Sequence, residues 1–256
     1  MTAIPPSLKT WSKCPQNRYS PDEFPAYWKT HDVITVLADT GMYDETRYHC
    51  LDTAEKEQHR QLKSDYFKKR FTVSRSLLRQ ILPLVPGMEN GAGIVMTREK
   101  NGRIRINNRP DIFISLSYSG AFIALTLGKR KVGSDIGMVH PRDIRKIRTR
   151  PLLDSLTGGI GRNQDQRLVH AWTLLEAYAK FRDMSLYPLT RDRFSLSDAH
   201  FVSYCIDSCA ILSLAYEGAS LQDSLLWIDP GCGSSRGRES MAAGSPLPYG
   251  GTNVRA

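Results

Sequence analysis

The sequence lacks the features that define several large classes of protein. No stretch approaches the ~20 consecutive apolar residues of a membrane-spanning helix, so we expect no membrane partner. Pro5 and Pro6 stand where a signal peptide would carry its apolar core, so we expect a cytoplasmic protein. There is also no Walker loop and no GxGxxG motif, which disfavours an ATPase or a dinucleotide-dependent enzyme.

Cysteine and histidine are too scattered to indicate a site. The five cysteines are odd in number and none lies in a CxxC pair, so neither a disulfide framework nor a zinc site is expected. The six histidines form no HxxxH pair. His170 lies within a predicted helix, and we expect it on the helix surface.

Positive charge, in contrast, is abundant. The formal net charge of +9 indicates an anionic partner, such as nucleic acid, an anionic membrane, a phosphorylated small molecule or an acidic protein. A basic run at residues 129–150 suits the docking of acidic protein helices, because complementary charge speeds association. Nucleic-acid binding is a remote alternative, since no RNP-like aromatic pair, zinc ligands or clear helix-turn-helix accompanies the run.

The pattern of apolar residues predicts an α+β fold built from two similar halves. We expect an extended N-terminal arm at residues 1–28 and an N-terminal α+β half at 29–131. A C-terminal α+β half with a metal site follows at 132–228, and a disordered tail rich in Gly, Pro and Ser at 229–256. Each half has the order strand, helix, strands, although no residue-level repeat is visible.

Two helices are the strongest local signals. Asp52 and Glu55 predict a capping box that opens a single long helix ending at Leu82. A second helix is predicted at 164–181, where apolar residues recur at helical spacing. The predicted strands are residues 31–39, 103–106, 112–116, 121–127, a short strand that ends at Asp135, and closing strands at 194–196, 201–206 and 210–216.

Three segments carry residues that point to chemistry: residues 113–120 (FISLSYSG), 132–137 (VGSDIG) and 172–180 (WTLLEAYAK). In this order and spacing they resemble the motifs FNISHSG, VGVDIE and W(S/T)xKEAxxK. These belong to the larger, surfactin-synthetase-activating type of 4′-phosphopantetheinyl transferase. Residues 70–79 also resemble the family's RF…RxLLR helix, and residues 101–103 occupy the place of its GKP turn. The resemblance covers about residues 33–216.

The resemblance implies both a fold and a reaction. The fold would be two α+β halves with pseudo-twofold symmetry and coenzyme A bound between them. The reaction would transfer the 4′-phosphopantetheine moiety of coenzyme A to a serine of an acidic acyl or peptidyl carrier protein. Such holo-acyl-carrier-protein synthases serve fatty-acid, polyketide or nonribosomal peptide biosynthesis. Because the chain holds both halves, we expect a monomer.

The implied metal site consists of Asp135 and Glu176. Mg²⁺ is usually bound by one or two carboxylates together with phosphate oxygens and water, and it would polarise the pyrophosphate of coenzyme A. By the resemblance, Glu176 is also a candidate general base, and Lys180 a catalytic residue that neutralises phosphate. The alternatives are a surface Glu176–Lys180 pair at i, i+4 and a turn or capping role for Asp135.

Five further residues are candidates for coenzyme A contact. By the resemblance, Arg103 and Ser117 match contact positions, with Arg103 in place of the usual lysine, and Tyr118 is a third candidate. Arg75 and Lys56 could extend the phosphate site from the long helix. A strand serine facing solvent and a solvated helical face would explain Ser117, Arg75 and Lys56 equally well.

The sequence departs from the family pattern at several positions. Gly137 stands where many members have a glutamate that is a further metal ligand, so Gly137→Glu is expected to tighten Mg²⁺ binding. Leu175 replaces the KEA lysine, and Tyr118 replaces the histidine of FNISHSG. Residues 152–153 (two leucines) lie where the family often has a paired-phenylalanine helix that meets the carrier. The alternatives are altered carrier specificity, or a catalytically weakened relative that binds coenzyme A or a carrier.

Overall fold

Both helices and strands build the protein, which confirms the α+β class. The computed structural model describes residues 8–11, 18–19, 21–42, 45–88, 94–99, 102–139, 163–186, 198–218 and 223–228. No helix within these ranges is long and apolar enough to cross a membrane.

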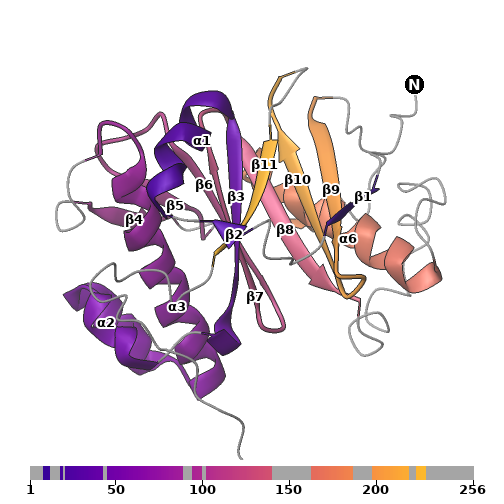
Figure 1. The fold of residues 1–256 in the computed structure, drawn as a ribbon. Coiled ribbons are helices and arrows are strands. Elements are labelled where there is room, and N and C mark those ends of the chain that lie inside the picture. Colours follow the sequence, from indigo (N-terminus) through magenta and orange to yellow (C-terminus); the bar gives the residue numbers. More distant parts are fainter. Residues whose placement is uncertain are drawn as a thin grey trace, which may run out of the picture.

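Two β-sheets form the centre of the molecule (Figure 1). The first sheet has the strand order β1 (Leu8–Trp11), β9 (His200–Ile206), β10 (Ala210–Tyr216) and β8 (Val132–Met138). The second has the order β2 (Arg18–Tyr19), β11 (Asp223–Ile228), β3 (Val33–Asp39), β7 (Phe122–Gly128) and β6 (Phe113–Ser119). A separate hairpin pairs β4 (Met96–Arg98) with β5 (Ile104–Ile106).

Helices cover the outer faces of both sheets. The helices are α1 (Phe24–Thr30), α2 (Thr53–Gln61), α3 (Asp65–Ile81) and α6 (Gln164–Arg182). Short 3₁₀ turns occupy Pro21–Glu23, Thr40–Met42, Glu45–Cys50 and Leu82–Leu84. Figure 1 shows α3 beside the second sheet and α6 beside the first, so the layers run helix, sheet, sheet, helix.

Apolar residues on both faces of the central strands explain why the two sheets lie between helices. In β7, Ile123, Leu125 and Leu127 join the core under α3, whereas Phe122 and Ala124 join the core between the sheets. Successive strand residues point to opposite faces, so a strand buried on both faces must be apolar at nearly every position. The cores on both faces of the sheets hold the β6 and β8 edges in place.

The two halves share one connectivity. In the first half, β3 leads through α3 to the hairpin of β6 and β7, and β3 pairs antiparallel with β7. In the second half, β8 leads through α6 to the hairpin of β9 and β10, and β8 pairs antiparallel with β10. The strand–helix–strands order expected for each half is therefore present.

The predictions of a capping box, of most strands and of the second helix are confirmed by the structure. The capping box of Asp52 and Glu55 is confirmed, with both of its hydrogen bonds present. The predicted strands at 31–39, 103–106, 112–116, 121–127, 201–206 and 210–216 correspond to β3, β5, β6, β7, β9 and β10. The second helix is confirmed as α6.

Two other expectations were wrong, and three concern residues that the structure does not describe. The single long helix is two helices, because Leu62 is extended and the side chain of Ser64 caps a new helix by accepting a hydrogen bond from the N–H of Phe67. Residues 1–28 are not simply an extended arm, since α1 begins at Phe24 and buries Phe24 and Trp28 in the core. The predicted strand at 194–196, residues 152–153 and the tail at 229–256 lie outside the described residues.

Candidate active site

A cleft of about 430 Å³ lies where β6, β8 and α6 meet, and it brings together Asp135, Glu176 and Lys180. Asp135 lies in the middle of β8, opposite Ser213 of β10, rather than at the strand end that we expected. This position rules out the alternative of a turn or capping aspartate. Glu176 and Lys180 lie one turn apart on α6, so one strand and one helix supply the three charged groups.

The Asp135 carboxylate is held through one oxygen. Lys180 Nζ donates to Asp135 Oδ1 at 2.7 Å and to the backbone oxygen of Ser134 at 3.0 Å. Ser117 Oγ also donates to Oδ1, at 2.6 Å. No donor from the described parts of the chain reaches Oδ2, so this oxygen can accept a further partner.

Glu176 has a different environment from Asp135. Its carboxylate is half-buried, and none of the described side chains forms a hydrogen bond or ion pair with it. Burial, and then the negative charge of Asp135, raise the pKa of Glu176 to about 7, while the positive charge of Lys180 opposes the shift. The alternative of a surface Glu176–Lys180 pair is wrong, because Lys180 pairs with Asp135.

These two carboxylates fit the demands of a divalent cation. A half-buried carboxylate with a raised pKa gains stability when a cation approaches, and Mg²⁺ requires only one or two carboxylates beside phosphate oxygens and water. In the described ranges, no group of three or more His, Cys, Asp or Glu side chains could hold a metal. The described carboxylates that line the cleft are Asp135 and Glu176.

A second cavity, of about 250 Å³, adjoins the cleft through shared lining residues Leu116 and Tyr118. Its described lining contains Arg70, Arg75 and Arg98 but no acidic side chain. The guanidinium group of Arg70 lies 4.5 Å from the ring centre of Tyr118. Arginines next to aromatic rings form a surface suited to a phosphorylated, planar ligand.

Arg75 is the most buried of the three arginines. Its side chain is 8% exposed, its Nε lies 3.4 Å from Glu55 Oε1, and this Nε makes no hydrogen bond with any described residue. Burial lowers the pKa of Arg75, and the positive charges of Arg98 and Arg79 add to this effect. The cavity thus holds a cation whose charge is only partly compensated.

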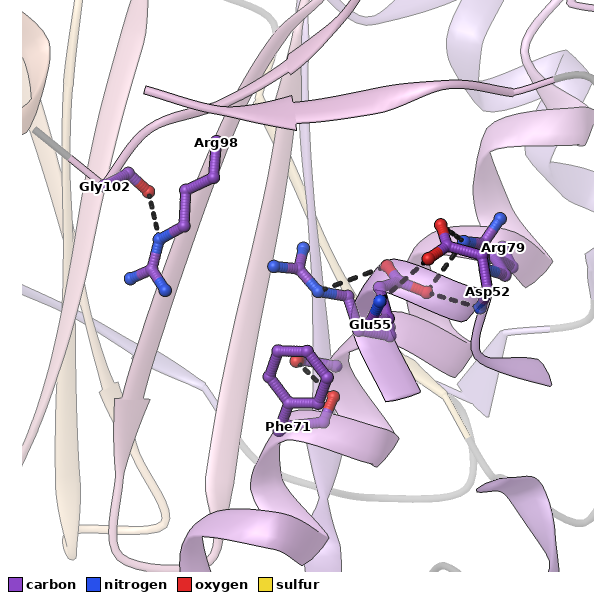
Figure 2. A network of polar contacts seen from close by, with 8 residues as sticks. Asp52, Glu55, Phe71, Arg79, Arg98 and Gly102 are labelled. Atoms are coloured by element: carbon purple, nitrogen blue, oxygen red, sulfur yellow. Dashed lines mark hydrogen bonds and ion pairs between the residues drawn. The ribbon is translucent and has the colours of Figure 1, made fainter. Parts of the chain in front are cut away.

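Neighbouring ion pairs orient the elements around this cavity. Figure 2 shows Arg79 reaching both carboxylates of the capping box, with Nη2 at 2.8 Å from Asp52 Oδ2 and 2.7 Å from Glu55 Oε2. Arg98 Nε donates to the backbone oxygen of Gly102 at 3.4 Å (Figure 2). The contacts with Asp52 and Glu55 fasten the start of α2 to α3.

Arg103 lines a third cavity, of about 260 Å³, together with Glu176 and Lys180, but its guanidinium group already has protein partners. Arg103 Nη1 donates to Asp183 Oδ2 at 2.6 Å, and Nη2 donates to the backbone oxygen of Lys180 at 2.8 Å. Burial lowers the pKa of Arg103. Arg103 therefore connects the first half to the end of α6.

The remaining candidates lie in different surroundings. Ser117 is 3% exposed, so the alternative of a strand serine facing solvent is wrong. Lys56 lies on α2 with its ammonium group 5.9 Å from the ring centre of Tyr48, and it lines none of these three cavities. His170 is fully buried, not on a helix surface as we expected. Arg70 and Arg98 were not identified as site residues from the sequence, because only the fold brings α3 and β4 together.

The packing of α6 against β8 explains the departure at Gly137. A Cβ atom added there would lie 2.9 Å from both Val169 Cγ1 and Thr173 Cγ2. Thr173 cannot rotate freely, because its hydroxyl hydrogen-bonds with Ser213 Oγ at 2.7 Å and donates to the backbone oxygen of His170. A side chain at position 137 would press on α6, so the packing does not support the expectation that Gly137→Glu would tighten Mg²⁺ binding.

The departure at Leu175 also has a structural explanation. Leu175 is fully buried against Ile211 and Ala215 of β10 and does not line the cleft. A lysine at this position would place an ammonium group in an apolar core. The replacement of the family's lysine by Leu175 therefore removes no cation from the cleft.

Comparisons with known proteins leave the family open, since no protein-family model matches the chain and no curated protein matches it.

Proposed function

We propose that this protein transfers the 4′-phosphopantetheine moiety of coenzyme A to a serine of an acidic acyl or peptidyl carrier protein, with Mg²⁺. The observation that carries the proposal is that Asp135 and Glu176 line the same cleft. This cleft adjoins a cavity that is lined by three arginines. The shared connectivity of the two halves also supports the pseudo-twofold transferase fold that the motifs imply.

The two cavities suit different parts of coenzyme A. The side chains of Arg70, Arg75 and Arg98 would bind the nucleotide phosphate, with Tyr118 beside the adenine. The pyrophosphate would then lie in the cleft near Lys180. Arg103 and Ser117 would support the site from within the protein, because their polar groups already bond to other residues.

The cleft residues account for the chemistry of transfer. Mg²⁺ would be held by Asp135 and Glu176 and would supply Lewis-acid polarisation of the pyrophosphate. By the resemblance, Glu176 is also the candidate to accept the proton of the carrier's serine hydroxyl. A bond then forms between the serine oxygen and the β-phosphorus, and the bond to 3′,5′-ADP breaks. Lys180 would stabilise charge on the departing phosphate.

One alternative has its own structural support. The cavity with three arginines does not depend on Asp135 or Glu176, so the protein could bind coenzyme A without transferring it. A catalytically weakened relative would behave in this way. Nucleic-acid binding remains the remote alternative, and the part of its basic run at residues 140–150 lies outside the described residues.

The experiment is incubation with coenzyme A, Mg²⁺ and a panel of apo acyl and peptidyl carrier proteins, followed by chromatography of the nucleotides. Transfer predicts release of 3′,5′-ADP that depends on the carrier. Calorimetric binding of coenzyme A without release for any carrier would support the weakened relative. Absence of coenzyme A binding would contradict both.

A further inference from the structure

Strands β6 and β8 lie side by side at the edges of different sheets, and serine hydroxyls join them. β6 pairs with β7, and β8 pairs with β10, so each is the last strand of its sheet. Ser115 Oγ accepts from the N–H of Ser134 at 2.9 Å, Ser117 Oγ from that of Ile136 at 3.1 Å, and Ser119 Oγ from that of Met138 at 2.9 Å. We call these three contacts the serine ladder.

The serine ladder follows from the period of a β-strand. Residues 115, 117 and 119 alternate along β6 and therefore point to one side, where alternate N–H groups of β8 lie. A buried backbone N–H without a partner is costly, and an unpaired strand edge can pair with another chain. The three hydroxyls remove both problems, because they accept the hydrogen bonds that carbonyl groups would accept in a continuous sheet.

The middle contact of the serine ladder differs from its neighbours. Ser117 Oγ donates its proton to Asp135 Oδ1 at 2.6 Å, whereas Ser115 Oγ donates to the backbone oxygen of Ser134 at 3.4 Å. Ser117 and Asp135 are 3% and 7% exposed. Ser117 is therefore the member of the ladder that touches a carboxylate of the cleft.

We propose that Ser117 is a positioning residue for Asp135 and does not bind coenzyme A itself. Its single O–H donor is already used by Asp135 Oδ1, and one of its lone pairs accepts from Ile136 N–H. Phosphate oxygens accept hydrogen bonds, so the hydroxyl has no proton left to donate to coenzyme A. The short rigid serine fixes Oδ1, and this leaves Oδ2 for a cation. Lys180 alone would hold Oδ1 through a long, flexible side chain, so Asp135 could rotate if Ser117 were lost.

The inference rests on the proposed function only for the use of Asp135 as a cation ligand. Its test compares Ser117→Ala with Ser115→Ala, because each variant removes one contact of the serine ladder but only the first removes the contact with Asp135. Mn²⁺ replaces Mg²⁺ as the probe, and the loss of free Mn²⁺ signal in electron paramagnetic resonance gives its affinity with coenzyme A present. The melting temperature and the metal-free affinity for coenzyme A are measured on the same samples.

The expected result separates the two variants. Both should lower the melting temperature, but only Ser117→Ala should weaken Mn²⁺ binding, by about tenfold, because a hydrogen bond to a charged group is lost. Ser117→Thr, which keeps a hydroxyl, should recover most of the Mn²⁺ affinity. The metal-free affinity for coenzyme A should match that of the wild type in all three variants.

Two results would overturn the inference. One is equal Mn²⁺ affinity in Ser117→Ala, Ser115→Ala and the wild type, or a wild type that does not bind Mn²⁺. The other is a selective loss of metal-free coenzyme A binding in Ser117→Ala, which would make Ser117 a ligand contact. The proposed function fails separately, if Mn²⁺ and coenzyme A bind but no carrier is modified.

Discussion

Single side chains in the cleft influence one another through charge as well as contact. Asp135 has two hydrogen-bond donors on one oxygen, whereas Glu176 has burial and a neighbouring negative charge. Glu176 therefore holds a proton more tightly than an exposed glutamate does. Sites of catalysis commonly contain such perturbed groups, at some cost in stability.

The raised pKa of Glu176 predicts an unusual pH dependence of stability in the metal-free protein. Because the pKa is about 7 in the folded chain and 4.5 ordinarily, the folded state binds the proton more tightly, and stability falls as pH rises between these values. Glu176→Gln should thus be more stable than the wild type at pH 8, by on the order of 1–3 kcal/mol after allowance for partial exposure.

Urea denaturation at several pH values measures this effect. The difference between Glu176→Gln and the wild type should disappear near pH 4, where both side chains are neutral. Glu57→Gln is the matched control, because Glu57 lies on the exposed face of α2 and should show little pH-dependent difference. A difference for Glu176→Gln that does not change with pH would contradict the assignment.

Gly137 gives a second prediction at this scale. Gly137→Glu should destabilise the protein by about 1–3 kcal/mol, because its Cβ would press on Val169 and Thr173, and it should not tighten Mg²⁺ binding. Chemical denaturation and metal titration measure the two effects. Tighter Mg²⁺ binding with unchanged stability would show that α6 leaves room for a third carboxylate.

At the scale of secondary-structure elements, the N-terminus of α2 is stabilised by contacts with α3. Glu55 is buried, accepts from the N–H of Asp52 at 3.1 Å and pairs with Arg79 at 2.7 Å. Glu55→Ala would remove the half of the capping box that the Glu55 side chain makes, and it would leave Arg75 and Arg79 without a buried partner. It should therefore cost about 2–5 kcal/mol.

Glu57 on the same helix again provides the comparison. It forms an exposed pair with Arg60, so Glu57→Ala should change stability by less than about 1 kcal/mol. Thermal and urea unfolding of both variants measure the contrast. Equal losses would mean that helix propensity, and not the buried network, stabilises α2.

Structural features that depend on residues close together in the sequence could generally be predicted, whereas features that depend on distant residues generally could not. The capping box at Asp52 was predictable, because the residues that form it are neighbours in the chain. The break at Leu62 was not, because the helical pattern continues through it and only Ser64 marks the new start. Strand β11 was missed, because its pairing with β3 joins residues far apart in the sequence.

The candidate site shows the same division. The motifs placed Asp135, Glu176 and Lys180 together, and these three residues line one cleft. They could not show that Arg103 is bonded to Asp183 or that Ser117 is bonded to Asp135, because both partners come from the other half of the chain. The contact of Gly137 with α6 was hidden because Val169 and Thr173 lie more than thirty residues further along the chain, and only the fold brings them to β8.

On the scale of the whole molecule, the site exists only because the two halves meet. The serine ladder joins β6 to β8, Arg103 joins the first half to α6, and an apolar core lies between the sheets. The arginine-lined cavity belongs to the first half, and the carboxylates belong to the second. In the proposed function, coenzyme A, with a 3′-phosphate and a 5′-pyrophosphate on its ribose, would span this junction.

Intact-mass measurement of an apo carrier protein, after incubation with coenzyme A and Mg²⁺, tests the central claim most directly. The wild type should add the mass of one phosphopantetheine group to the carrier, and excess EDTA should prevent the addition. Asp135→Ala and Glu176→Ala should lose nearly all transfer while circular dichroism shows a folded protein, whereas Glu57→Ala should retain it. Full transfer by either cleft variant, or transfer that persists in EDTA, would contradict the account.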